Sequence, residues 1–131
     1  MEASVAGARK DGYVSTLFSR RRYLPEINSR NFQRRSFAER TAINTPIQGT
    51  AADIIKLAMV EVDRRLEAEG LVARMLLQVH DELVLETTAD ELRQVAGLVR
   101  GAMEDIVQLD VPLVVDVKTG SNWYNLEPLK D

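Results

Sequence analysis

Two adjacent acidic residues in the middle of the chain, Asp81 and Glu82, have the residue types needed for metal-ion chemistry. Together with His80 they separate two short apolar runs, residues 75–79 and 83–86, which predict a tight antiparallel hairpin with this polar triplet at its turn. Carboxylates held in a rigid turn can bind Mg²⁺ beside a phosphate. Charged residues also occupy solvated turns routinely. Adjacent side chains point in different directions, so Asp81 and Glu82 need not share an ion.

The composition restricts the chemistry further. The 131 residues contain no cysteine and one histidine, which excludes disulfides, thiolate zinc sites, cysteine nucleophiles and clusters of several histidines. A Ser-His-Asp triad could use only His80. Any metal site must therefore consist mainly of carboxylates, which are the ligands that suit Mg²⁺ or Mn²⁺.

Charge is distributed unevenly along the chain. Residues 1–40 contain nine Lys or Arg and four acidic residues, a net charge of +5, whereas the remainder has 8 basic and 16 acidic residues, a net charge of −8. Such asymmetry indicates a polyanionic partner, nucleic acid above all. The same arginines could instead be solvated or paired with the acidic half of the chain, so charge alone leaves both interpretations open.

The elements that must position these residues follow from the pattern of apolar and turn residues. A helix that ends at Gly12, a strand-like run, and an arginine-bearing loop or hairpin are predicted over residues 1–11, 13–18 and 20–29. A helix is then predicted from about residue 31 to residue 44. After it, Pro46 either kinks the helix or begins a second one with Thr45 as its N-cap.

The second half of the chain contains two more predicted helices. After Thr50 the apolar residues recur at the spacing of one helix face, up to a stop at Gly70; they are Ile55, Ala58, Met59, Val62 and Leu66. Thr88 and Glu91 fit a capping box for a helix that ends near Leu109. A strand-like run and a C-terminal tail are predicted over residues 111–117 and 120–131.

This order of elements predicts an α+β fold, with helices packed on a small antiparallel sheet. The length of 131 residues suits one domain. No apolar run approaches the roughly 20 residues of a membrane span, and the N-terminus has no secretory signal, so we expect a cytoplasmic protein without a membrane partner.

Four segments resemble the family A, bacterial polymerase I-like, DNA polymerases. Residues 76–86, with the hairpin and its acidic turn, are similar to motif C of that family. The other segments resemble the region after the fingers, a palm segment and the C-terminal end; they are residues 13–25, residues 38–53, and residues 111–113 with 120–123. The resemblance follows the order of the family and covers essentially the whole chain. Motif C alone is moderately specific, whereas the four segments together are highly specific.

The resemblance has two departures. Ser19 stands where the family often has glycine before its arginines. Motif A, with the other metal-binding aspartate, and motif B in the fingers are absent from the 131 residues, as are thumb and exonuclease domains. Residues 1–131 are therefore expected to be a C-terminal palm fragment of a DNA polymerase, a partial palm built around the motif C hairpin.

The resemblance implies a chemistry for the acidic turn. In the family, a primer 3′-hydroxyl attacks the α-phosphorus of a deoxynucleoside triphosphate (dNTP) and releases pyrophosphate, with two Mg²⁺ ions at the attacking and leaving oxygens. It implies that Asp81 is one of the two principal metal-binding carboxylates. Glu82 would be a second catalytic residue beside it, in a supporting role.

The resemblance also implies a set of DNA-binding residues. His80 would lie near the primer terminus, and Gln48 and Asn44 would approach the primer–template duplex. Arg22 and Arg40 would contact phosphates, which gives affinity without sequence specificity. From the sequence alone, Gln48 and Asn44 could equally cap a helix near Pro46, and the two arginines could be ordinary surface charges.

Two functions therefore compete. The first is part of a DNA-directed DNA polymerase that acts in replication or repair. The second is a non-catalytic module that binds nucleic acid or associates with itself, because a palm cut from its sheet should expose apolar surface. With only one of the two metal aspartates, the isolated chain is expected to be inactive and to form a dimer or a higher oligomer.

Overall fold

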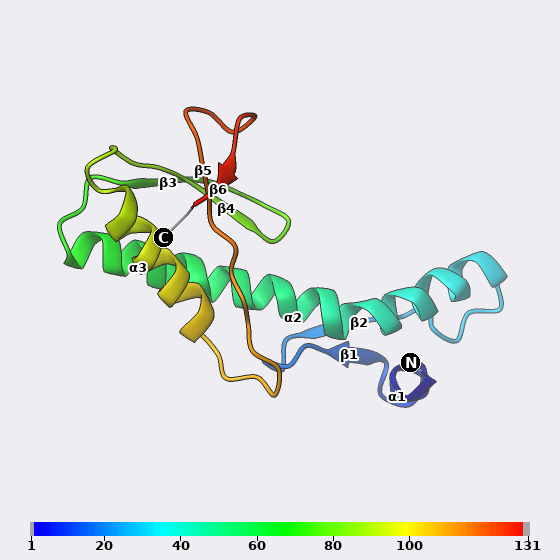
Figure 1. Cartoon of the computed structure of the whole chain (residues 1–131). Helices are drawn as coiled ribbons and strands as arrows, with labels where there is room; N and C mark the ends of the chain where they lie inside the picture. Colours follow the sequence, from blue (N-terminus) through cyan, green and yellow to red (C-terminus); the bar gives the residue numbers. More distant parts are fainter. Residues whose placement is uncertain (1, 130–131) are drawn as a thin grey trace. The chain divides into compact units, whose positions relative to one another are not determined.

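The computed structural model describes the backbone of residues 2–129 (Figure 1). It consists of three α-helices and six short β-strands, which confirms the α+β class. The strands form three separate two-stranded antiparallel sheets, β1–β2, β3–β4 and β5–β6, where one small sheet was predicted. The chain divides into two compact units, Met1–Asp53 and Ile54–Asp131, which we call unit 1 and unit 2. The length alone had suggested one.

Unit 1 begins with α1 (Glu2–Asp11), which ends at Gly12 as predicted. Gly12 has φ +80°, and its N–H donates to the Ala8 carbonyl over 2.7 Å, which closes the helix end. Strands β1 (Tyr13–Ser15) and β2 (Arg21–Tyr23) then form an antiparallel hairpin. The predicted strand-like run over residues 13–18 is confirmed in its first three residues, but its partner is the start of the segment 20–29, which forms no hairpin by itself. They pack with α1 and α2 on a small core of aliphatic residues, namely Ala8, Val14, Leu24, Ile27, Ala38 and Ala42.

Helix α2 (Phe32–Ala68) contains residues of both units. Its N-cap is Asn31, whose Oδ1 accepts hydrogen bonds from the N–H groups of Gln33 and Arg34 over 3.0 and 3.2 Å. The helix continues through Pro46, so the interpretation of Pro46 as the start of a second helix with Thr45 as N-cap is wrong. A loop of unit 1 contacts α2 just after this proline, at Gly49, Thr50 and Asp53.

Unit 2 contains the rest of α2, the hairpin of β3 (Arg74–Val79) and β4 (Glu82–Glu86), and α3 (Leu92–Asp105). The predicted apolar stripe of α2 is confirmed: Ile55, Ala58, Val62 and Leu66 are buried. The core of unit 2 joins Val62 and Leu66 of this stripe to Ala73 and to the buried face of α3, whose members are Val95, Val99 and Ala102. On the outer side of α2, hydrogen bonds from Arg64 and Arg65 lower the pKa of Glu61 to about 2.

The predicted capping box of α3 is wrong. The helix begins at Leu92 with Glu91 at the N-cap, and no side chain caps it. The Glu91 carboxylate instead accepts a hydrogen bond from the Val72 N–H over 3.0 Å, a contact between residues 19 positions apart that local spacing cannot predict. Thr88 lies too far upstream to act as the cap.

The C-terminal end of unit 2 also differs from the prediction. Helix α3 ends at Asp105 rather than near Leu109, and residues 111–117 form no strand. Glu104 in the last turn accepts a hydrogen bond from the Val115 N–H over 2.9 Å, which ties this segment to the helix end. The strand pair lies further on, between β5 (Lys118–Thr119) and β6 (Glu127–Pro128). Among residues 2–129, none of the helices is both long and apolar enough to cross a bilayer.

Candidate functional site

The acidic turn lies at the tip of the β3–β4 hairpin in unit 2. Val79 pairs with Glu82, so the connection consists of His80 and Asp81 alone, and Glu82 is the first residue of β4. The predicted hairpin is confirmed, with a turn one residue shorter than expected. His80 has φ +55°, a left-handed conformation that two-residue hairpin turns require at their first position. The His80 carbonyl accepts a hydrogen bond from the side-chain amide of Gln78, which ties the turn to strand β3.

The hairpin is anchored on the core of unit 2 through one of its faces. Met75, Leu83 and Leu85 pack against the buried cluster of α2 and α3. A shift in the strand register between Met75 and Leu77 marks a bulge near the base of the hairpin. The turn therefore projects from a packed base, and its position is set by the strands rather than by contacts of its own side chains.

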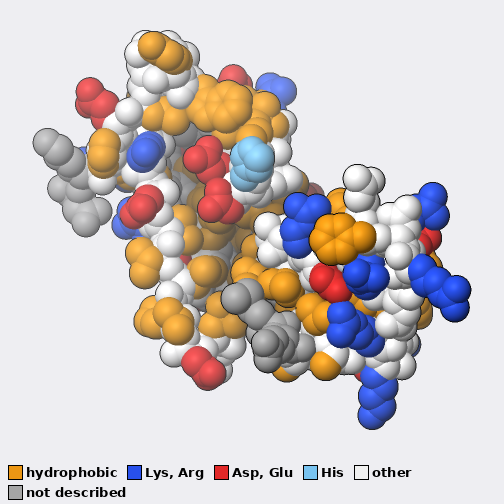
Figure 2. Space-filling view, turned by 90° about the vertical axis from the view of Figure 1, so that its right-hand side faces the viewer, with side chains coloured by type: hydrophobic (Ala, Val, Ile, Leu, Met, Phe, Trp, Pro, Cys, Tyr) orange, Lys and Arg blue, Asp and Glu red, His pale blue; other side chains and the backbone are white. Residues whose placement is uncertain are grey.

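The side chains of His80, Asp81 and Glu82 are exposed to solvent. Within residues 2–129 neither carboxylate accepts a hydrogen bond or forms a salt bridge, so both are available to an external cation or donor. Figure 2 shows acidic side chains beside the one histidine of the chain. Carboxylate oxygens are the donors that Mg²⁺ prefers, so the residue types fit this ion. The described part of the chain contains no group of three or more His, Cys, Asp or Glu placed to hold a metal, so the turn alone does not form a complete metal site.

Three of the predicted DNA-binding residues form a row on α2 within unit 1. Arg40, Asn44 and Gln48 follow one another at intervals of four residues, which places them on one helix face. All three are exposed, and Phe37 extends the same row by one turn with 61% of its surface exposed. The alternative in which Asn44 and Gln48 cap a helix end is wrong, because both lie inside α2.

Arg22, the fifth predicted DNA-binding residue, does not belong to this row. It lies on β2 directly opposite Val14, on the face of the β1–β2 hairpin that carries this buried valine. Its side chain is exposed, and it forms no salt bridge with any described carboxylate.

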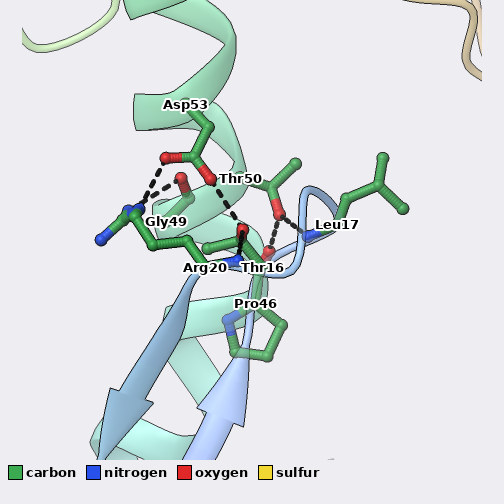
Figure 3. Close-up of polar contacts among 7 residues, drawn as sticks. All are labelled: Thr16, Leu17, Arg20, Pro46, Gly49, Thr50 and Asp53. Carbon is green, nitrogen blue, oxygen red and sulfur yellow. Dashed lines mark hydrogen bonds and ion pairs between the residues drawn. The ribbon is translucent and has the colours of Figure 1, made fainter.

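A polar network that sequence reasoning missed joins the loop after β1 to α2 just after Pro46 (Figure 3). The buried hydroxyl of Thr16 donates to one oxygen of Asp53 over 2.7 Å, and the Arg20 Nε donates to the other oxygen over 2.7 Å. The Asp53 side chain is only 11% exposed, so this charge is well shielded from water. No periodic signal could have linked residues that lie 33 and 37 positions apart.

A second part of the network reaches the helix backbone. The Arg20 guanidinium donates to the Gly49 carbonyl over 3.3 Å, and the Leu17 N–H donates to the Thr50 hydroxyl over 2.9 Å. The same hydroxyl donates to the Pro46 carbonyl. Proline has no N–H for the preceding turn and disfavours a helix interior. The network thus supplies contacts from outside the helix at Gly49, Thr50 and Asp53, directly after the proline and Gln48.

Replacing Gly49 with alanine is expected to destabilise the chain by about 1–2 kcal/mol, because an overpacking cost of about 1–3 kcal/mol outweighs a helix-propensity gain of about 0.5–1 kcal/mol. A Cβ at this position would lie 2.7 Å from the Thr16 Cγ2, which is buried. Thermal unfolding followed by circular dichroism measures the effect.

Gly97 of α3 is a matched control, because a Cβ there would meet no atom within 4 Å. Gly97→Ala should stabilise the chain by about 0.5–1 kcal/mol. Thr16→Ser removes the clashing methyl group but keeps the hydroxyl, so it should make Gly49→Ala less costly. Equal melting temperatures for Gly49→Ala and Gly97→Ala would contradict the close approach at Gly49.

The amino-acid sequence is similar to those of known DNA polymerases. The family model described as DNA polymerase family A matches residues 1–125. DNA polymerase I of Streptococcus pneumoniae is 57% identical over 124 residues, which cover 95% of this chain and 14% of that protein. DNA polymerase I of Bacillus subtilis is 56% identical over 125 residues, with the same two coverages. The chain thus spans about 14% of the length of these relatives.

A solved structure is also similar to this chain. It is described as the POL domain of Pol1 from M. smegmatis in complex with DNA primer-template and dNTP. The match has 54% sequence identity and a TM-score of 0.82, and it covers 86% of this chain and 20% of that one. At this identity the likeness extends to the sequence as well as to the fold.

Proposed function

The chain belongs to DNA polymerase family A, and from this premise we propose that it forms part of the nucleotidyl-transfer site of a DNA-directed DNA polymerase. The reaction joins a dNTP to a primer 3′-hydroxyl under direction of a template. The observation that carries the proposal is the family match over residues 1–125, because it includes the exposed acidic turn and the polar row on α2. We assign residues 1–131 to the C-terminal palm portion of that enzyme.

In this proposal Asp81 binds Mg²⁺ and Glu82 supports it. The exposed carboxylates make no contact with described residues that a cation would have to break. Two bound Mg²⁺ ions would stabilise the attacking and leaving oxygens of the transfer. Further ligands have to come from outside the described residues, because these hold no larger cluster of metal-binding side chains. The role of the hairpin is to hold Asp81 rigidly at its tip.

The remaining residues would hold the primer–template. Gln48 and Asn44 would hydrogen-bond to minor-groove acceptors, which all base pairs share, so they sense pair geometry without reading sequence. Arg40 and Arg22 would neutralise phosphates. His80, beside Asp81 in the turn, would lie near the primer terminus. These polymerase and DNA-binding roles are supported by the solved relative, whose description includes DNA primer-template and dNTP.

A chimeric polymerase tests the proposed function. These 131 residues would replace the matching segment of DNA polymerase I from Bacillus subtilis, whose 56% identity favours correct folding. We expect template-directed primer extension within about tenfold of the unmodified enzyme, a difference of ~1.4 kcal/mol in the barrier. A folded chimera that binds primer–template but extends no primer would instead support the alternative function, a non-catalytic nucleic-acid-binding module.

Arg40→Ala in the chimera is expected to weaken primer–template binding equally for all sequences. Removing one phosphate contact should reduce the slope of log affinity against log salt by about 1. Arg64→Ala is the matched control, because Arg64 is an exposed arginine of the same helix that is already paired with Glu61. Fluorescence anisotropy at several salt concentrations measures both slopes. Equal slopes for the Arg40 and Arg64 variants would refute the phosphate contact.

A further inference from the structure

One face of the β1–β2 hairpin carries two tyrosines and an arginine that no part of the proposed function uses. In the register of the hairpin Tyr13 pairs with Tyr23, and Ser15 pairs with Arg21. Because side chains alternate between the two faces of a strand, Tyr13, Arg21 and Tyr23 share one face. Val14, which is buried, and Arg22 lie on the other face. The hairpin thus has one face toward the core and one aromatic, basic face.

The three side chains are already assembled against one another. The Arg21 guanidinium lies 4.3 Å from the centroid of the Tyr13 ring, and the two tyrosine rings are 5.6 Å apart at a tilt of 58°. A hydrogen bond with Tyr23 raises the pKa of Arg21 above its ordinary value. Flat groups held in this way lose little conformational entropy when a ligand binds.

This face is open to a ligand at Arg21 and Tyr23, which are exposed, whereas Tyr13 is half-buried beneath the Arg21 guanidinium. Tyr23 is 65% exposed, so part of its ring is accessible as well as its hydroxyl. Four arginines of unit 1, namely Arg9, Arg20, Arg34 and Arg35, form salt bridges with carboxylates. Arg21 forms none with the described residues, so its charge remains available. Figure 2 shows Lys and Arg side chains gathered with hydrophobic side chains between them.

We propose that the Tyr13–Arg21–Tyr23 face binds the unpaired bases of a single DNA strand by stacking. Bases stack on tyrosine rings and on arginine planes, and they do so with little regard to sequence. Paired bases inside a duplex are already stacked on both sides, so the face selects a strand that is not paired. The net charge of +5 on residues 1–40 adds attraction for the phosphates of that strand.

This inference rests on the proposed function and deepens it. Template-directed synthesis requires a template strand that is unpaired ahead of the primer end. The stacking face would hold that strand without reading it, which suits an enzyme that must copy any sequence. The row on α2 and the acidic turn would act on the paired part and on the primer end.

Binding of the full 131-residue chain to two labelled oligonucleotides tests the inference. One is oligothymidine, and the other has the same length and backbone but no bases. The chain should bind oligothymidine more tightly, and Tyr23→Ala should lower that affinity about tenfold while leaving binding of the abasic strand unchanged. Tyr23→Phe keeps the ring and should retain most of the affinity, which separates lost stacking from lost folding. Tyr124→Ala is the matched control, because Tyr124 is 95% exposed and lies in the C-terminal segment of unit 2.

Arg21→Lys gives an independent measurement. Lysine keeps the positive charge but lacks the planar guanidinium on which a base can stack. Affinity for oligothymidine should therefore fall a few-fold, which is about the strength of one cation–π contact. The slope of log affinity against log salt should stay unchanged. The inference is overturned if the chain binds neither oligonucleotide, if it binds both equally, or if the Tyr23→Ala and Tyr124→Ala variants behave alike. Primer extension by the chimera is scored separately, so the stacking face can fail while the polymerase function stands.

Discussion

Asp81→Asn in the chimeric polymerase is expected to lower the rate of nucleotide incorporation about a thousandfold, a barrier increase of ~4 kcal/mol. Asparagine has the size of aspartate and keeps one carbonyl oxygen, but it has no negative charge. If Asp81 is a principal ligand, the neutral amide weakens metal binding where charge develops in the transition state. A pre-steady-state incorporation assay at saturating dNTP measures the effect.

The structure indicates that this substitution leaves the fold intact. Asp81 is exposed and accepts no hydrogen bond within the described part of the chain. The turn is held instead by the contact between Gln78 and the His80 carbonyl, and by strand pairing from Val79 to Glu82. Affinity for primer–template should therefore stay close to that of the chimera, since phosphate contacts dominate it.

Two further variants make this prediction specific. Asp90→Asn changes another exposed aspartate of unit 2, in the segment before α3, and should incorporate nucleotides normally. The incorporation rate of Glu82→Gln should lie between those of Asp81→Asn and Asp90→Asn, because Glu82 has a supporting role. Raising the Mg²⁺ concentration should recover part of the Asp81→Asn activity if metal affinity is what was lost. Near-normal turnover by Asp81→Asn, or an equal loss in Asp90→Asn, would refute the assignment.

The parts of the fold that could be predicted from sequence depend on neighbours in the chain. The stripe from Ile55 to Leu66 repeats at helical spacing, and the β3–β4 hairpin has two apolar runs with a polar turn, so each is encoded within a short window. The wrong predictions concern places where distant residues meet. Pro46 remains inside α2, and seven residues later Asp53 accepts hydrogen bonds from Thr16 and Arg20, far away in the chain. Glu91 fails to complete a capping box because its carboxylate accepts from Val72.

The candidate site shows the same division. Arg40, Asn44 and Gln48 share a helix face that follows from their spacing, once α2 is known to continue through Pro46. Which of Arg21 and Arg22 shares a face with the two tyrosines depends on the strand register. The register places these adjacent arginines on opposite faces of the β1–β2 hairpin. The resemblance pointed to Arg22. The aromatic partners that distinguish Arg21 come from the pairing of Tyr13 with Tyr23, which depends on the strand register and not on spacing within either strand.

The purified 131-residue chain on its own is expected to show no template-directed primer extension, even at high Mg²⁺ concentration. Its described residues contain no group of three or more side chains that could hold a metal, and Asp81 and Glu82 are adjacent residues on a turn and a strand end. A two-metal transfer needs ligands on both sides of the reacting phosphate, so one acidic turn cannot supply it. Affinity for DNA can persist without activity, because it depends on separate groups such as Arg40.

A gel-based extension assay over long incubation tests this, with the chimera as the positive control and the Asp81→Asn chain as the matched negative. A trace of contaminating polymerase would give the same extension in both preparations of the chain, because it does not depend on Asp81. Primer extension by the unmodified chain that is lost in Asp81→Asn would contradict the prediction, because this turn would then support catalysis without further ligands. We expect no extension from the unmodified chain or from the Asp81→Asn chain, whereas the chimera should extend the primer and lose this activity when it carries Asp81→Asn. These results together would mean that Asp81 acts only with ligands from outside these residues.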